Sequence, residues 1–423
     1  MSLKRILHIL FIGISCYLLL LTPPSGTNAI LLIGLSAALL FEPYTLIPLL
    51  FVTSISSSIA VIPGISGYYY YTYLFLLGCF IKYPFRLELK HNVITIILYI
   101  ACLTISALCS VSQDMSPAIK MIIAIAPLII IASLQFIDNN QELLYYTYIG
   151  AIIVSTIITI KLILDPVLYI PNEEILSYYT DLEEAQITFA KEINPNTTAQ
   201  SLLLAFVIIF IYAINSTKRK ILLFALTIIP SIPILLIGSR TVFIALISIA
   251  TIFFLWKAQI KRSSKILIAL TCLIAGGFVM DWIVSINDRF ILEDIYEDRG
   301  SGRFDTWEHL FNNVIPYNLM LGVGYGRINL TWLGYDVDAD NMYVDALSQI
   351  GVCGLMSLLL MLTSMTKPLL RNNTRVVVNQ IALAMMIFII IVGFGETIFD
   401  TYIFVFIIFF TLIAIQRSNR QIR

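Results

Sequence analysis

The chain has 423 residues, of which 59% are hydrophobic and 12% are charged, whereas a soluble domain carries about 25% charged residues. This composition excludes an ordinary soluble protein and predicts a polytopic membrane protein. The 26 basic and 26 acidic residues cancel to a formal net charge of zero, so net charge identifies no partner, and nothing in the sequence indicates nucleic acid as one.

A membrane-spanning helix needs about 20 mostly apolar residues, and fewer where it is short or buried among other helices. The sequence predicts an all-α fold with twelve to fourteen such helices. The first follows Lys4 and Arg5 without a convincing cleavage site, so we interpret it as a membrane helix and not as a signal peptide. Pro230 and Pro233 are expected to break the ninth. The predicted spans are 6–22, 28–41, 45–63, 69–82, 93–111, 118–136, 143–164, 198–214, 221–237, 241–256, 266–285, 341–366, 376–393 and 398–416.

The positive residues predict the orientation. If the N-terminus is cytoplasmic, the inner loops and both ends hold 18 of the 26 Lys and Arg residues, and no loop breaks the alternation expected from the positive-inside rule. Both termini are therefore expected to be cytoplasmic. This divides the chain into N-terminal helices (1–164), a first large outer loop (165–197), central helices (198–285), a second large outer loop (286–340) and C-terminal helices (341–423).

Polar sequence is concentrated in the two outer loops. The first holds seven acids and one base, Lys191; the second holds ten acids and four bases. The sequence shows no internal repeat and no matching pair of interrupted helices, which many secondary transporters would show. The chemistry is therefore expected on the outer side. The four bases of the second loop are Arg289, Arg299, Arg303 and Arg327.

Two arginines are candidate anion ligands. Arg240, in "LLIGSRTVFIAL", lies where one span reaches the outer surface and the next begins, and a charge there is costly without a partner. The alternative is an arginine that snorkels to the membrane surface. In "RGSGRFDTWEHLF", Ser301 can cap a short helix that places Arg303 and Trp307 one turn apart. Such a pair suits a phosphate or sugar ligand, although an interfacial helix with a tryptophan anchor has the same pattern.

Other motifs have structural explanations. In "EINPNTTAQ", Asn196 or Thr197 is predicted to cap the eighth span. The "GVGYG" sequence lacks a preceding strand and is no nucleotide fingerprint. The six cysteines and three histidines provide no C-x-x-C pair, zinc spacing or catalytic triad. We therefore expect no metal ion and no cofactor.

The start of the twelfth span carries acids at alternate positions, Asp336, Asp338 and Asp340. A calcium loop is not formed, because Asn341 and Leu347 stand where an EF-hand needs glycine and glutamate; a looser divalent site stays open. Alternatively, Asp340 or Asn341 caps the span and presents a carboxylate to the arginines. Glu396, in the last outer turn, is a similar acid near the membrane.

The ordered motifs "INPNTTAQ", "IGSRT", "SGRFDTWEHLF", "LGVGYG" and "DNMYVDALSQIGVCGL" resemble the bacterial O-antigen polymerase/O-antigen ligase superfamily over roughly residues 193–355. The resemblance implies a metal-independent, inverting glycosyltransferase of the GT-C type in the bacterial inner membrane, with its active site facing the periplasm. Its substrates would be undecaprenyl-pyrophosphate-linked oligosaccharides, and a chain-length-determining co-polymerase would be a partner.

The resemblance also suggests roles for residues. Arg240 and Arg303 would hold the pyrophosphate, and the remaining candidates for substrate binding are Arg299, Arg289, Lys191, Asn196, Trp307, Asn341 and Tyr343. Ligases of the superfamily typically have a His-Asn pair where this chain has Asp340-Asn341, which favours a polymerase of the Wzy type.

The attacking sugar hydroxyl needs a base, and the departing pyrophosphate needs charge stabilisation. Asp340 is the first candidate for the base, followed by Asp338 and Glu396. A ligase that transfers polymer to lipid A–core is the alternative enzyme. A lipid-linked oligosaccharide flippase is the alternative of another class. A flippase should have charged residues within its spans and two related halves with short loops, whereas this chain has two large outer loops rich in charge.

Overall fold

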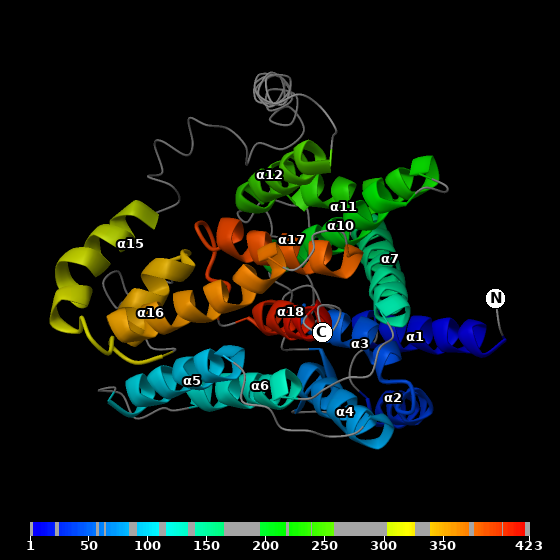
Figure 1. Ribbon diagram of the computed structural model, residues 1–423, viewed down its shortest axis with the longest axis horizontal. Helices are drawn as coiled ribbons and strands as arrows, with labels where there is room; N and C mark the ends of the chain where they lie inside the picture. Colours follow the sequence, from blue (N-terminus) through cyan, green and yellow to red (C-terminus); the bar gives the residue numbers. More distant parts are fainter. Residues whose placement is uncertain are drawn as a thin grey trace, which may run out of the picture. The chain divides into compact units, whose positions relative to one another are not determined.

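The computed structural model describes residues 3–21, 25–55, 59–62, 65–83, 91–109, 116–133, 140–164, 195–216, 220–237, 239–257, 303–325, 339–371, 376–399 and 401–418, and these are almost entirely helical (Figure 1). Most of the first predicted outer loop, the span predicted at 266–285 and much of the second outer loop lie outside the described residues.

The chain forms two compact units, Met1–Phe75 with Asn139–Ile291, and Leu76–Asp138 with Leu292–Arg423. In the first unit, α7 contacts α1, α3, α10 and α11. Helix α4 (Gly67–Lys82) begins in the first unit and ends in the second. The other elements described in the first unit are α1 (Leu3–Leu21), α2 (Gly26–Leu39), η1 (Pro43–Leu46), α3 (Ile47–Thr53), β1 (Ala60–Ile62), β2 (Ile65–Ser66), α7 (Asn140–Leu164), α10 (Pro195–Asn215), α11 (Lys220–Ile237) and α12 (Arg240–Lys257).

In the second unit, α5 packs against both α6 and α16, and α18 contacts α6, α16 and α17 (Figure 1). The interior of this packing is apolar, and α17 and α18 are buried along most of their length. The elements described here are α5 (His91–Cys109), α6 (Ser116–Ser133), α15 (Arg303–His309), η4 (Leu310–Val314), η5 (Ile315–Tyr317), α16 (Met342–Arg371), α17 (Val377–Val392) and α18 (Tyr402–Ser418).

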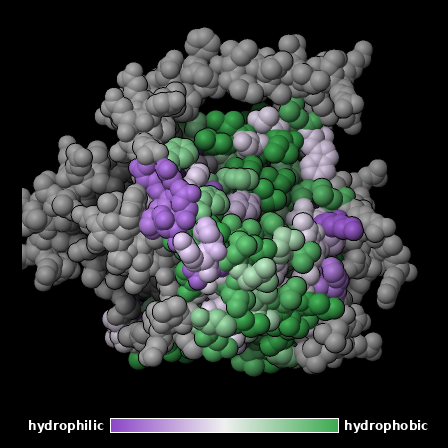
Figure 2. All heavy atoms as spheres, turned by 90° about the vertical axis from the view of Figure 1, so that its left-hand side faces the viewer, coloured by the Kyte–Doolittle hydropathy of each residue, from purple (hydrophilic) through white to green (hydrophobic). Residues whose placement is uncertain are grey.

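The protein is an all-α polytopic membrane protein. Among the described residues, six helices are long and apolar enough to cross a membrane, and six further apolar helices are shorter. Helices prevail because the bilayer core has no water to bond the backbone N–H and C=O groups, which must therefore bond one another within the helix. Hydrophobic residues cover most of the coloured part of Figure 2, while hydrophilic residues gather toward its left and right sides. Large apolar side chains such as Ile30, Leu108 and Leu370 are more than half exposed, as expected for a surface that meets lipid.

The prediction of one helix over 45–63 is wrong. The helix ends at Thr53, because Ser54 donates from its backbone N–H to Leu50 O and from its hydroxyl to Phe51 O and so satisfies the last carbonyl groups. The following β-branched residues of "IAVIPGIS" form β1 and β2, which pair antiparallel. Gly67 closes this hairpin by donating its N–H to Ile59 O at 2.7 Å.

The expectation that Pro230 and Pro233 break the ninth span is also wrong, because α11 runs through both. Pro233 cannot donate to the carbonyl of Ile229, four residues earlier. The hydroxyl of Thr159 on α7 lies 3.1 Å from that carbonyl oxygen and 2.6 Å from the carbonyl oxygen of Ser155 on its own helix, so its one proton is shared between the two. A hydroxyl from a neighbouring helix thus replaces the bond that the proline removes.

Replacing Thr159 with valine should therefore destabilise the packing of α7 on α11. The carbonyl of Ile229 would lose a donor in an apolar environment, which costs about 1–3 kcal/mol. We expect a lower apparent melting temperature of the purified protein in detergent. Thr159→Ser, which keeps the hydroxyl, should retain most of the stability; equal melting temperatures for the valine and serine variants would contradict this explanation.

Helix α16 is kinked at Gly351, where φ is 70° and ψ is −174°. The segment Leu319–Gly324 lies against this kink and bonds to it through the backbone. Val323 N donates to Ser348 O at 2.9 Å, Gly324 N to Gln349 O at 2.9 Å, and Val352 N to Leu319 O at 2.8 Å. The backbone groups released by the kink are thus satisfied by the segment Leu319–Gly324, which includes the first part of the "LGVGYG" motif.

Replacing Gly351 with alanine should strongly destabilise the second unit. An added Cβ would collide with the backbone of Met320, and alanine at this φ and ψ costs about 1–3 kcal/mol by itself. We expect a lower yield of monodisperse protein and a lower melting temperature. Gly34→Ala is the matched control, because a Cβ at Gly34 in α2 meets nothing within 4 Å. An unchanged melting temperature for Gly351→Ala would contradict the role of this glycine.

Candidate functional site

The short helix α15 presents two of the predicted residues. Arg303 and Trp307 lie one turn apart on it, as the sequence predicts; the proposed cap, Ser301, lies outside the described residues. The indole N–H of Trp307 donates to Ala339 O at 2.6 Å, and its ring meets Phe304 edge-on with centroids 5.4 Å apart. Trp307 therefore fixes the backbone just before Asp340.

Arg303 contacts two carboxylates of the second unit. Its Nε donates to Asp340 Oδ2 at 3.0 Å, and its Nη2 lies 3.7 Å from Glu396 Oε1. A guanidinium has five N–H donors, and Arg303 makes no other hydrogen bond or ion pair with a residue that the structure describes. Donors therefore remain for an anionic ligand.

Glu396 differs from Asp340 in burial. Its side chain is 10% exposed, whereas that of Asp340 is 43% exposed. Burial raises the pKa of Glu396 to about 7; Arg303 acts in the opposite direction, and the charge of Asp340 raises the pKa further. A carboxylate with such a pKa binds a proton more tightly than an ordinary glutamate and still ionises near neutral pH. Glu396 is thus suited to proton transfer.

The start of α16 is tied to the end of α17, which brings these groups together. Asn341 is the cap of α16: its Oδ1 accepts from the N–H groups of Tyr343 and Val344, at 3.0 and 3.2 Å. Its Nδ2 donates to Phe394 O at 3.0 Å, and the Tyr343 hydroxyl donates to Ile390 O at 3.2 Å. Asn341 and Tyr343, proposed from the sequence as substrate ligands, make structural contacts here.

Asp340 has an unusual backbone. Its φ of +47° is the one positive value at a non-glycine position among the described residues, and aspartate tolerates the left-handed region better than most residues. The buried carboxylate of Asp345 supports this turn by accepting from Ala339 N at 3.2 Å and from the hydroxyl of Thr397. Asp345 thus links the turn that carries Asp340 to the segment that carries Glu396.

Sequence reasoning missed Asp345. A signal was available, because an ionisable residue inside an apolar helix is rare and usually has a function. Asp345 is fully buried one turn into α16. In the sequence, the alternating acids Asp336, Asp338 and Asp340 just before the helix form a clearer pattern than the single Asp345.

Two other candidates lie in the first unit. Arg240 begins α12, and Asn196 lies in the first turn of α10, which packs against α12. The prediction that Asn196 or Thr197 caps the eighth span is wrong, because α10 already begins at Pro195, whose fixed φ suits the first helical position. Next to these residues, the buried Ser239 hydroxyl and Gln200 Oε1 have no hydrogen-bond partner within the described part of the chain.

The remaining candidates, Asp338, Arg289, Arg299 and Lys191, lie outside the described residues, as does Asp336. Within the described ranges, no group of three His, Cys, Asp or Glu side chains could hold a metal ion. Around the guanidinium of Arg303, these ranges bring together the partly exposed carboxylate of Asp340 and the buried carboxylate of Glu396. This arrangement can bind an anion and accept a proton beside it.

A family model, Wzy_C, described as O-antigen ligase, matches residues 225–359. The match supports the O-antigen polymerase/ligase superfamily. It includes Arg240, Arg303 and Asp340 and ends before Glu396. Members of this superfamily are glycosyltransferase-like enzymes, and the match does not separate polymerases from ligases. A comparison with curated proteins found no match.

Proposed function

We propose that this protein polymerises a surface polysaccharide by joining oligosaccharide repeat units that are linked to undecaprenyl pyrophosphate. In this proposal it lies in the bacterial inner membrane with both termini in the cytoplasm, and the site around Arg303 faces the periplasm. The observation that carries the proposal is the contact of Arg303 with both Asp340 and the buried Glu396, in a chain that matches the O-antigen ligase family model.

The proposed step is an inverting substitution at the anomeric carbon of the donor sugar. A hydroxyl of the acceptor sugar attacks this carbon and loses its proton to Glu396. The new glycosidic C–O bond forms while the C–O bond to the pyrophosphate breaks, and undecaprenyl pyrophosphate leaves with the bonding electrons. Arg303 stabilises the negative charge that develops on the leaving group, and no other reactant is needed.

Asp340 is assigned to positioning in this proposal. Because it accepts from the Nε of Arg303, it orients the guanidinium and leaves the Nη groups for the ligand. Its side chain is more exposed than that of Glu396, and it lies 3.0 Å from Arg303, whereas Glu396 lies 3.7 Å away. We therefore favour Glu396 over Asp340 as the base. Arg240 remains a second candidate ligand for the pyrophosphate.

A ligase is the second candidate, because the matched family model is described as O-antigen ligase. The pair Asp340-Asn341 stands where ligases of the superfamily typically have His-Asn, and this difference favours the polymerase. We also expect a chain-length-determining co-polymerase as a partner, because polymerases of this type act with one.

Deleting the gene and analysing both surface polysaccharide and undecaprenyl-linked glycans tests the proposal. Loss of the polymer ladder, with single repeat units still reaching the surface, is the result expected for a polymerase. Long polymer that stays attached to undecaprenyl pyrophosphate, together with surface lipid A–core that carries no polymer, would instead identify a ligase. Repeat units trapped on the cytoplasmic side would identify a flippase and overturn the proposal.

A further inference from the structure

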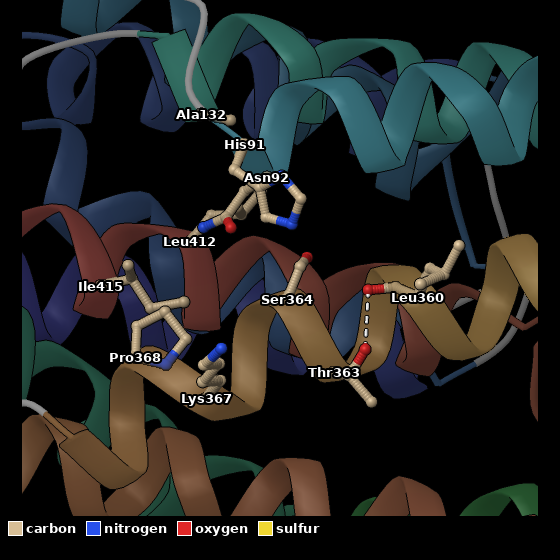
Figure 3. Close-up of a pocket in the computed structure, with 10 residues that line it drawn as sticks. All are labelled: His91, Asn92, Ala132, Leu360, Thr363, Ser364, Lys367, Pro368, Leu412 and Ile415. Carbon is tan, nitrogen blue, oxygen red and sulfur yellow. Dashed lines mark hydrogen bonds between the residues drawn. The ribbon is translucent and has the colours of Figure 1, made fainter.

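A pocket of about 500 Å³ lies in the second unit between α5, α6, α16 and α18. Figure 3 shows His91 and Asn92 at the start of α5 facing Ser364 and Lys367 on α16 across the space between the two helices. The remaining lining residues are Ala132, Leu360, Thr363, Pro368, Leu412 and Ile415. One side of the pocket is therefore polar and the other is apolar.

The polar side is suited to an anion. Lys367 supplies a positive charge, the Asn92 amide can donate, and His91 adds an imidazole, while none of the described residues that line the pocket has a carboxylate. None of these three side chains makes a hydrogen bond or ion pair with another residue in the described part of the chain. The first-turn N–H groups of α5 also lie here, and the N-terminus of a helix attracts negative charge.

This pocket is remote from the proposed catalytic site. Helix α16 begins beside Asn341, and Ser364 and Lys367 lie in its last turns. At 1.5 Å per residue, the helix separates the pocket from Glu396 by on the order of 30 Å. The two sites therefore lie at opposite ends of the helices of the second unit, and the pocket is not part of the site around Arg303.

The apolar side favours a lipid as the occupant. Leu360, in the wall of the pocket, is about half exposed, and so is Met356 one turn further along α16. These side chains extend from the pocket along the helix toward the middle of the span. An acyl chain that follows them would place its headgroup phosphate between Lys367 and His91.

We propose that this pocket binds the phosphate ester of an anionic phospholipid headgroup, with Lys367 and His91 as its ligands and Leu360 in contact with an acyl chain. On the predicted topology this lipid belongs to the cytoplasmic leaflet. The lipid would hold α5 against α16 at the end opposite the catalytic site. This proposal does not depend on which sugar chemistry the protein performs.

The test titrates the purified full-length protein in detergent with short-chain phosphatidylglycerol, followed by native mass spectrometry. We expect Lys367→Gln to weaken binding about five-fold, the effect of removing one cation near an anionic lipid surface, and His91→Gln to weaken it as well. Lys4→Gln is the matched control, because Lys4 is an exposed lysine of the other unit that pairs with Glu42; it should bind like the wild type.

Two further titrations distinguish the source of the phosphate. Phosphatidylcholine, which carries no net charge, should bind more weakly than phosphatidylglycerol, and inorganic phosphate should not displace the lipid at equal concentration. Equal binding of the two lipids, displacement by equimolar phosphate, or unchanged binding by Lys367→Gln would each overturn the proposal.

Discussion

Replacing Glu396 with glutamine is expected to lower the rate of glycosyl transfer by about 10²–10⁴-fold, the usual contribution of a positioned general base. Glutamine has nearly the same shape as glutamate and removes the ionisable group, so the contact with Arg303 is weakened but the packing is kept. Because Glu396 is buried, its neutral form is already compatible with the fold. The measurement is polymer formed per unit time by purified protein with lipid-linked repeat units.

Glu308→Gln provides the control for this variant. Glu308 lies on α15, close in sequence to Arg303, but its side chain is exposed. Its loss should leave the rate unchanged. If Glu396→Gln folded normally and retained full activity, Glu396 would not be the base.

Replacing Arg303 with alanine should lower the rate by about 10²–10³-fold, the effect of removing one group that stabilises developing negative charge. Arg303→Lys should recover only part of the activity. A lysine ammonium keeps the charge but cannot bond Asp340 through one nitrogen and present other nitrogens to a pyrophosphate. The initial rate with lipid-linked repeat units, measured at saturating substrate, checks this.

Asp340→Asn separates a role in binding from a role in folding, because asparagine also tolerates the positive φ of this position. It removes one charge of the same ion pair, 3.0 Å long in the structure, but leaves the guanidinium in place. We expect a smaller loss of activity than for Arg303→Ala. Equal losses in the two variants would mean that Arg303 matters only because it pairs with Asp340, and would contradict its role at the pyrophosphate.

Much of the fold could be predicted from the sequence, because long apolar runs in a membrane leave the helix as almost the only option for the backbone. The failures occur where a distant residue compensates for a local signal. Pro233 does not end α11 because Thr159, 74 positions earlier in the chain, bonds the freed carbonyl. The kink at Gly351 likewise depends on the backbone of Leu319–Gly324, which no local pattern predicts.

The three side chains that the structure brings together, Arg303, Asp340 and Glu396, are all candidates from the sequence, and their roles stay predictions. The spacing of Arg303 and Trp307 predicted their common position on α15, and Asn341 caps α16 as one of the two expected residues. The sequence favours Asp340 as the base on the expectation that partial burial raises the pKa of this carboxyl. Burial, which distinguishes Glu396, depends on how the end of α17 packs against the start of α16, and a single sequence does not report that packing.

The pH dependence of the transfer rate tests the central claim most directly. Since the base must be ionised, kcat/KM of the wild type should rise with pH through a midpoint at about 7, the pKa of Glu396. Arg303 lowers this pKa and Asp340 raises it, so Asp340→Asn should move the midpoint to lower pH and Arg303→Lys should leave it close to the wild-type position. A rate that is constant between pH about 6 and about 8, or a midpoint that Asp340→Asn leaves unchanged, would contradict Glu396 as the base.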